Sequence, residues 1–165
     1  MIDLDKHKLK ADKQANENKV FLAKLNRKPP RDLDLQAQQL HHEAFEHINC
    51  LECANCCKSI SPIIIDRDVD RIAKFLRMKP SDLIDEYLHL DTDGDYVFRQ
   101  SPCPFLMADN YCRIYDVRPR ACREYPHTDR RRFHQISKLT WKNTFICPAA
   151  LEVVEKLKIN YKGAL

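Results

Sequence analysis

The residues best suited to chemistry are four cysteines within eight positions, in the run Cys50-Leu-Glu-Cys53-Ala-Asn-Cys56-Cys57. Two-residue gaps allow a tight turn to bring successive thiolates onto one ion, which is the spacing of zinc and iron–sulfur sites. A single Cys-x-x-Cys could equally be a redox pair. Two overlapping copies with an adjacent fourth cysteine favour a metal site.

The adjacent pair Cys56 and Cys57 raises the question of how the run divides its ligands. In an extended segment neighbouring side chains point to opposite sides. We therefore expect the pair to serve two different sites, or one thiolate to bind while the other packs. A vicinal disulfide is the competing alternative, although it would be strained and short-lived in a reducing cytosol.

Four further cysteines follow at wider intervals: Cys103, Cys112, Cys122 and Cys147. The first two bracket a predicted hairpin, and Cys122 lies on the helical turn after it. Cys147 directly precedes a predicted helix, whose N-terminus favours a thiolate. Each alone could be a small buried hydrophobic residue. Together with the run at 50–57 they supply enough thiolates for two sites of four ligands.

The cysteine-bearing segments resemble the CxxCxxCC family, the YkgJ-like cysteine-cluster proteins. The resemblance covers roughly residues 48–150 and rests on the run at 50–57 followed by Cys103-Pro-Phe-Leu106, Cys112-Arg-Ile-Tyr115, Arg118-Pro119-x-x-Cys122-Arg123, Trp141 and Cys147-Pro148. It implies a zinc- or iron-chelating domain in which all eight cysteines are candidate ligands. It also implies kinship with flagellin lysine N-methylases, which carry a similar cysteine set and depend on an iron–sulfur cluster. The family usually has glycine where this chain has Asn55, and asparagine also tolerates the left-handed backbone that such a turn requires.

The charge pattern of the chain offers a second function. The formal net charge is +4, and residues 113–142 hold nine basic and three acidic side chains with aromatic residues among them. A basic, aromatic segment is typical of a nucleic-acid surface. Two sites, each with four thiolates and one divalent ion, would however add roughly −4 and bring the loaded chain near neutrality.

We therefore expect some of these arginines to serve the metal site. Arg113, Arg118 and Arg123 are predicted to lie beside the thiolates or to brace the hairpin and helical turn. Arg130–Arg132 lies outside the cysteine segments and is the better candidate for a phosphate or partner contact.

Length and composition set the class of protein. The chain has 165 residues, 44% of them hydrophobic and 32% charged, which is typical of a globular protein. Only two glycines are present, which excludes glycine-rich phosphate-binding loops. No apolar run approaches the ~20 residues needed to span a bilayer. The first residues show no apolar stretch behind their charges, so we predict no secretory signal and a cytoplasmic location.

Apolar spacing, capping residues and prolines predict the elements that carry the cysteines. The expected order is a charged helix over 1–28, a helix from Asp32 to the cysteine run, an extended segment at 61–65, helices capped by Asp66 and Ser81, a strand at 96–99, a hairpin over 105–115, a helical turn at 119–123 and a closing helix from Pro148. The polar segment 127–146 has no clear pattern.

These observations predict a mainly helical α+β protein, held together by metal, with one β-hairpin and a cysteine-rich loop. Residues 1–30 are predicted to be an accessory charged helix and linker, and residues 31–165 the metal-binding domain. The predicted function is chelation of zinc or an iron–sulfur cluster by Cys50, Cys53, Cys56, Cys57, Cys103, Cys112, Cys122 and Cys147.

Two alternatives remain open. One is an iron–sulfur redox or methyl-transfer enzyme, and the other is a nucleic-acid-binding module that uses residues 113–142. The expected partner is a metal ion, with a protein partner as a further candidate. Nucleic acid is the less expected partner, because thiolates account for the basic excess, and no membrane association is predicted.

Overall fold

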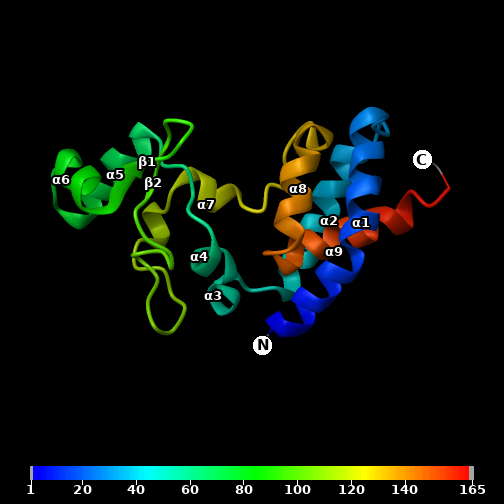
Figure 1. Ribbon diagram of the computed structural model, residues 1–165, viewed down its shortest axis with the longest axis horizontal. Coiled ribbons are helices and arrows are strands. Elements are labelled where there is room, and N and C mark those ends of the chain that lie inside the picture. The colour runs from blue at the N-terminus through cyan, green and yellow to red at the C-terminus, as the bar shows by residue number, and fades with distance from the viewer. Residues whose placement is uncertain (1, 164–165) are drawn as a thin grey trace. The chain divides into compact units, whose positions relative to one another are not determined.

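The computed structural model describes residues 2–163 and divides the chain into two compact units (Figure 1). Unit 1 comprises Met1–Asn49 and Pro126–Leu165, and unit 2 comprises Cys50–Tyr125. Unit 2 is therefore an insertion between two halves of unit 1. This division differs from the predicted boundary between residues 30 and 31.

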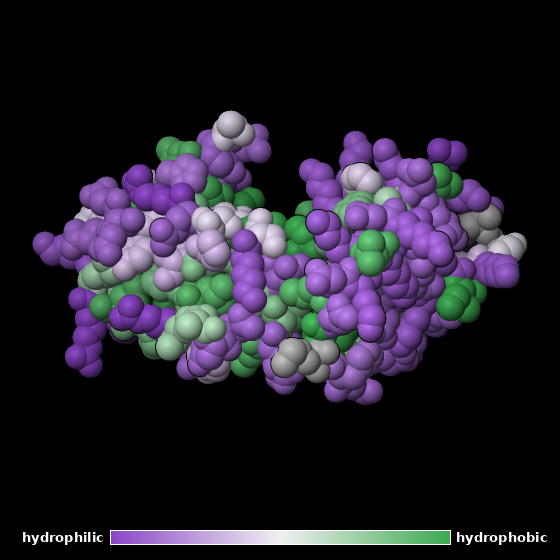
Figure 2. Space-filling model, turned by 60° about the horizontal axis from the view of Figure 1, so that its bottom comes forward, coloured by the Kyte–Doolittle hydropathy of each residue, from purple (hydrophilic) through white to green (hydrophobic). Residues whose placement is uncertain are grey.

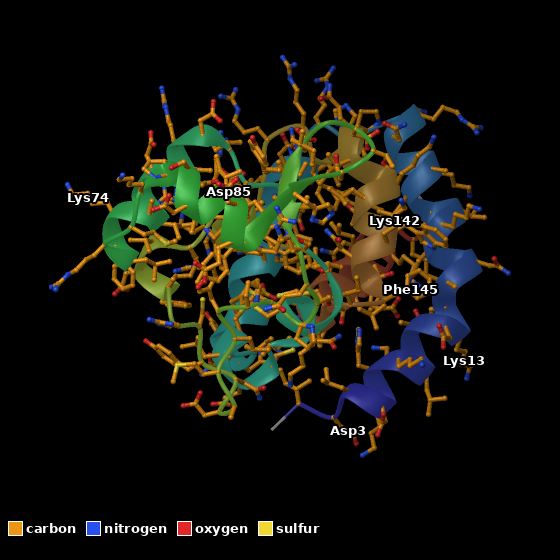
Figure 3. All side chains as sticks on the ribbon, turned by 60° about the vertical axis from the view of Figure 1, so that its left-hand side comes forward. Asp3, Lys13, Lys74, Asp85, Lys142 and Phe145 are labelled. Carbon is orange, nitrogen blue, oxygen red and sulfur yellow. The ribbon has the colours of Figure 1, made fainter. Side chains whose placement is uncertain are left out.

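Unit 1, within the described residues, is a bundle of four α-helices and a short 3-10 helix. These are α1 (Leu4–Arg27), α2 (Leu33–His47), η2 (Phe133–Ile136), α8 (Ser137–Thr144) and α9 (Pro148–Asn160). Helix α9 packs against α1, α2 and α8, and α1 also packs along α8. Figure 3 shows this last pairing, with Lys13 on α1 and Lys142 and Phe145 labelled at and beyond the end of α8.

The inner side of α1 explains why it belongs to this bundle. Its buried residues include Ala11, Leu22 and Leu25, which recur at helical spacing. The Asp3 carboxylate caps the helix by accepting the N–H of Lys6 at 3.0 Å. The apolar residues near 20–25 were sufficient to predict a helix here, although Val20 is 58% exposed. Helix α1 packs against α8 and α9 within unit 1, and its predicted role as an accessory element stays a prediction.

The remaining core of unit 1 comes from α2 and α9. Helix α2 buries Leu33, Ala37, Leu40 and Ala44, which recur at helical spacing. Helix α9 begins at Pro148, as predicted, and its buried residues are Ala149, Ala150, Leu151, Val153, Val154 and Leu157. Fully burying each large aliphatic side chain contributes about 1.5–3 kcal/mol.

Unit 2 consists of short elements. These are α3 (Cys50–Cys53), α4 (Asn55–Ser59), α5 (Asp66–Leu76), α6 (Pro80–Tyr87), β1 (Leu88–Leu90), β2 (Tyr96–Phe98), η1 (Tyr115–Val117) and α7 (Arg120–Glu124). Strands β1 and β2 form an antiparallel hairpin in which Leu88 is opposite Phe98. Gly94 has a φ of 84° in the turn between them, as expected for a residue that frees the backbone to reverse.

The core of unit 2 lies among α5, α6 and the hairpin. Its buried residues are Ile64, Val69, Ile72, Ala73, Leu83, Leu88, Phe98, Phe105 and Ile114. Hydrophobic colour is more extensive on the visible face of unit 2 than on that of unit 1 (Figure 2). The three helices that carry cysteines in this unit, α3, α4 and α7, contain no buried residue.

The predicted fold class, mainly helical α+β with a β-hairpin, is confirmed. Three local details differ. Asp66 and Pro80 are the first residues of their helices, preceded by Ile65 and Lys79, so Asp66 and Ser81 are not the caps. Residues 88–90 form a strand that was not predicted, and the predicted hairpin at 105–115 contains one bridge, between Leu106 and Cys112.

Across residues 2–163, no helix is both long enough and apolar enough to cross a lipid bilayer.

Candidate metal centre

The cysteine run folds as two short helices, where an extended backbone was considered. Cys50 and Cys53 lie on α3, and Cys56 and Cys57 lie on α4. The chain turns between them at Ala54, whose φ of 48° is left-handed. The left-handed residue is thus Ala54 and not the adjacent Asn55, which starts α4. A left-handed alanine costs roughly 1–2 kcal/mol, so the surrounding structure must hold this turn in place.

The adjacent cysteines contact each other. A hydrogen bond from the Cys56 side chain, the largest cause, lowers the pKa of the Cys57 thiol to about 7. In a helix neighbouring side chains are separated by about 100° and do not point to opposite sides. All eight cysteines are free thiols, so the vicinal disulfide is not present.

The segment that carries Cys103 and Cys112 is attached to the cysteine run by its backbone. The Cys103 N–H donates to the Cys57 carbonyl at 2.8 Å. The Asn110 amide donates to the Glu52 carbonyl at 3.3 Å, and the Ser101 hydroxyl to the Lys58 carbonyl at 3.1 Å. These bonds place Cys103 next to α4 and hold the tip of the 105–115 turn on α3.

Cys122 is positioned by a buried ion pair that the sequence analysis missed. The Asp68 carboxylate on α5 is 1% exposed and accepts the first N–H of α7, from Arg120, at 3.2 Å. Arg71 donates to Asp68 at 2.6 Å and to the Arg118 carbonyl at 2.9 Å. The pair therefore fixes the segment that enters α7. The available signal was a charged pair at i and i+3, Asp68 and Arg71, that alternates with the apolar Val69 and Ile72.

Partial burial raises the pKa values of the thiols around this segment; Cys103, Cys112 and Cys122 are half-buried, and Cys50 is exposed. Burial raises the pKa of Cys103 to about 11 and that of Cys122 to about 12, and it also raises the pKa values of Cys50 and Cys112. A second cause is mutual repulsion, because a Cys57 thiolate raises the pKa of Cys103, Cys112 and Cys122. The Cys103 N–H bond to the Cys57 carbonyl and the Leu106–Cys112 bridge place three of these cysteines on neighbouring segments.

Arg118 opposes these effects. Its positive charge lowers the pKa values of Cys50, Cys112 and Cys122. The guanidinium lies 3.9 Å from the centre of the Tyr115 ring and donates to the Tyr115 carbonyl at 2.7 Å. Arg118 thus braces the turn at Tyr115, and its predicted place beside bound thiolates stays a prediction. Arg113 contributes a backbone bond to the Phe105 carbonyl at 2.9 Å, and Arg123 is exposed.

Cys147 belongs to unit 1, whereas the other seven cysteines belong to unit 2. It precedes α9, is 8% exposed, and donates its N–H to the Asn143 carbonyl at 2.8 Å. Its predicted role as a ligand stays a prediction.

The candidate ligands of unit 2 are cysteine sulfur atoms, which are the ligands that thiophilic metals prefer. Sulfur ligands suit zinc and iron–sulfur clusters. Within residues 2–163, no three His, Cys, Asp or Glu side chains are already grouped to hold a metal ion. The thiols thus share a neighbourhood without forming a finished coordination shell.

A comparison with protein families gives a match over these segments. The model of CxxCxxCC, described as a "Putative zinc- or iron-chelating domain", matches residues 49–148, which is more than half of the chain. The matched range contains all eight cysteines. No curated protein and no solved structure gives a significant match.

Proposed function

Because the chain belongs to this family of chelating domains, we propose that unit 2 binds zinc or an iron–sulfur cluster through cysteine thiolates. The primary ligand set is Cys57, Cys103, Cys112 and Cys122. Cys50, Cys53 and Cys56 form a second group on α3 and α4. Cys147 is retained as an eighth ligand on sequence grounds alone.

The observation that carries this proposal is the placement of free thiols from separate segments: the Cys103 N–H donates to the Cys57 carbonyl at 2.8 Å, and Cys112 forms a backbone bridge with Leu106. Anionic Cys57, Cys103 and Cys112 each raise the pKa of Cys122, which burial raises further. Thiolates in one neighbourhood repel one another unless a cation is bound among them. A bound metal ion offsets this repulsion with its positive charge, and it binds the deprotonated form of its ligands. Arg118 supplies one positive charge at the same place.

The local structure supports the same conclusion. Helices α3, α4 and α7 have 4, 5 and 5 residues and bury none of them. Isolated helices shorter than roughly 12–15 residues are marginal in water. Metal ligation contributes folding free energy directly, of the order of 10 kcal/mol for structural zinc sites. A bound metal would therefore draw the thiols together and stabilise the segments that carry them.

The choice of metal decides between a binding module and an enzyme. Zinc would tie the segments together without redox chemistry, whereas an iron–sulfur cluster would supply electron transfer. The full chain should be purified without oxygen, followed by metal analysis, a visible spectrum and thiol titration. A colourless zinc protein would support the module, and a brown, oxygen-sensitive one the redox alternative. Eight reactive thiols with no bound metal would end both.

Single substitutions test the ligand set. Cys103→Ser and Cys122→Ser should each lower the metal content by about half or more, since each removes one of four ligands. Cys147→Ser in unit 1 is the matched control and should retain the metal of the primary site. Equal loss in all three variants would contradict the assignment of the primary set to unit 2.

A further inference from the structure

Unit 1 carries a group of exposed cations that the metal centre does not explain. This group, called here the basic end, consists of Arg27, Lys28, Arg31, Arg130, Arg131 and Arg132, all exposed. The residues come from two segments about a hundred positions apart. Only the second of these segments was predicted to contact a phosphate or a partner.

Hydrogen bonds join the two segments. The Asp34 carboxylate at the start of α2 accepts the N–H of Arg132 at 2.7 Å and that of Phe133 at 3.0 Å. The Gln38 amide donates to the Asp129 carbonyl at 3.2 Å. Helix α1 also contacts η2, which follows Arg132 directly. Figure 1 shows the turn from α1 to α2 and the chain entering α8 at the same end of unit 1.

The acidic side chains of these segments are engaged with unit 1 itself. Asp34 holds the two backbone N–H groups, and Asp32 accepts the Tyr161 hydroxyl at 2.9 Å. Asp129 lies 3.8 Å from the His41 ring. In the described part of the chain, none of the six cations at the basic end forms an ion pair. By contrast, Lys156 and Lys158 on α9 each pair with two glutamates.

The charge of each unit sharpens this contrast. Unit 1 has 17 basic and 11 acidic side chains, a formal +6, whereas unit 2 has 11 basic and 13 acidic side chains, a formal −2. Seven of the eight cysteines belong to unit 2. Their thiolates therefore add to an excess of negative charge in unit 2 and leave the basic excess of unit 1 without an explanation.

We propose that the basic end of unit 1 binds the phosphate backbone of double-stranded nucleic acid without sequence preference. Six exposed guanidinium or ammonium groups suit a polyanion with regularly spaced phosphates, and arginine can bind a phosphate through two N–H groups. The neighbouring aromatic residues are occupied. Phe133 is 1% exposed, and the Trp141 indole donates to the Ala15 carbonyl at 2.9 Å. The surface thus offers charge without a base-stacking platform, which favours a duplex over a single strand.

Binding of a short fluorescent DNA duplex of arbitrary sequence, measured by anisotropy at several salt concentrations, tests this proposal. We expect affinity to fall as salt rises, with a log–log slope of roughly −0.9 for each phosphate contacted. Arg130→Gln, Arg131→Gln and Arg132→Gln together should weaken binding at least about tenfold at low salt and reduce the steepness of the slope by up to about three.

The matched control removes the same amount of positive charge from the N-terminal half of α1, outside the basic end. Lys8→Gln, Lys10→Gln and Lys13→Gln together replace three exposed lysines and should leave most of the affinity intact. Equal weakening by both triple variants would overturn the assignment, because net charge alone would then explain binding. Absence of salt-dependent duplex binding, or binding only to anionic lipid vesicles, would overturn the proposal itself. Circular dichroism and metal content should be unchanged in both variants, which separates this test from that of the metal centre.

Discussion

The two units of this protein are stabilised by different interactions. Unit 1 has helices of 24, 15 and 13 residues whose inner sides bury Leu22, Leu25 and Leu157 almost completely. The cysteine-bearing helices of unit 2 have four or five residues and bury none. Apolar packing thus accounts for how α1, α2 and α9 are held in unit 1. The thiol-bearing part of unit 2 depends on backbone hydrogen bonds and, as we propose, on metal ligation.

Metal removal should separate the units most clearly. Chelation of the anaerobic protein should speed hydrogen exchange at the amides of Ala54, Cys103 and Arg120 by about 100-fold or more, because the segments lose their shared cation. The amides of α9 should keep their protection. If hydrogen exchange rose equally in both units, metal ligation would not be specific to the stability of unit 2.

A cavity in the bundle should have the complementary effect. Leu157→Ala removes a side chain that is 0% exposed, and we expect a loss of about 2–5 kcal/mol in the free energy of unfolding of unit 1. Urea unfolding followed by the fluorescence of Trp141, the only tryptophan, reports on unit 1. Ile159→Ala on the same helix is the control, since Ile159 is 72% exposed and should cost less than about 0.5 kcal/mol. Metal content should not change in either variant.

Breaking the Asp68–Arg71 pair should affect unit 2 without removing a thiol. Asp68→Asn leaves Arg71 without its buried partner and weakens the bond to the start of α7. We expect a loss of about 2 kcal/mol, below the range for fully buried pairs, because the Arg71 side chain is 31% exposed. Metal affinity, measured by competition with a chelator, should fall, whereas the exposed Asp70→Asn should retain it. Unchanged affinity in Asp68→Asn would mean that α7 is placed by other contacts.

Mild acidification should produce the smallest effect on the stability of unit 1. Burial, the largest cause, lowers the pKa values of His7 and His41 below 6.5. Because the unfolded chain binds these protons more readily, the stabilisation is present above pH 6.5 and is lost as the pH falls from 6.5 through the folded-state values. The urea midpoint reported by Trp141 should be lower at pH 5.5 than at pH 7.5. Replacing both histidines with glutamine should flatten this dependence.

The sequence predicts those elements of the fold that have a regular apolar pattern. The series Leu33, Ala37, Leu40 and Ala44 predicts α2, and Pro148 marks the first residue of α9. Residues 137–144 gave no such pattern because the inner face of α8 is polar. Its buried residues are Ser137, Thr140, Asn143 and Thr144, which are ordinarily exposed residue types.

The site was predictable in composition and less so in geometry. Cysteine spacing identified the family, but it carries no helical periodicity, so α3 and α4 and the left-handed Ala54 were not expected. Asp68 acts on α7 through contacts some fifty residues away in the chain, which no local pattern encodes. The residues that pack α1 onto α8 likewise do not indicate that a second unit is inserted between them.

The insertion of unit 2 between α2 and α8 has a consequence for synthesis. A growing chain emerges from the ribosome with its N-terminal part first. Helices α1 and α2 must therefore wait for α8 and α9, whereas every cysteine from Cys50 to Cys122 has been translated before the bundle can close. The nascent chain would thus be able to acquire its metal while half of its largest helical assembly has still to be made.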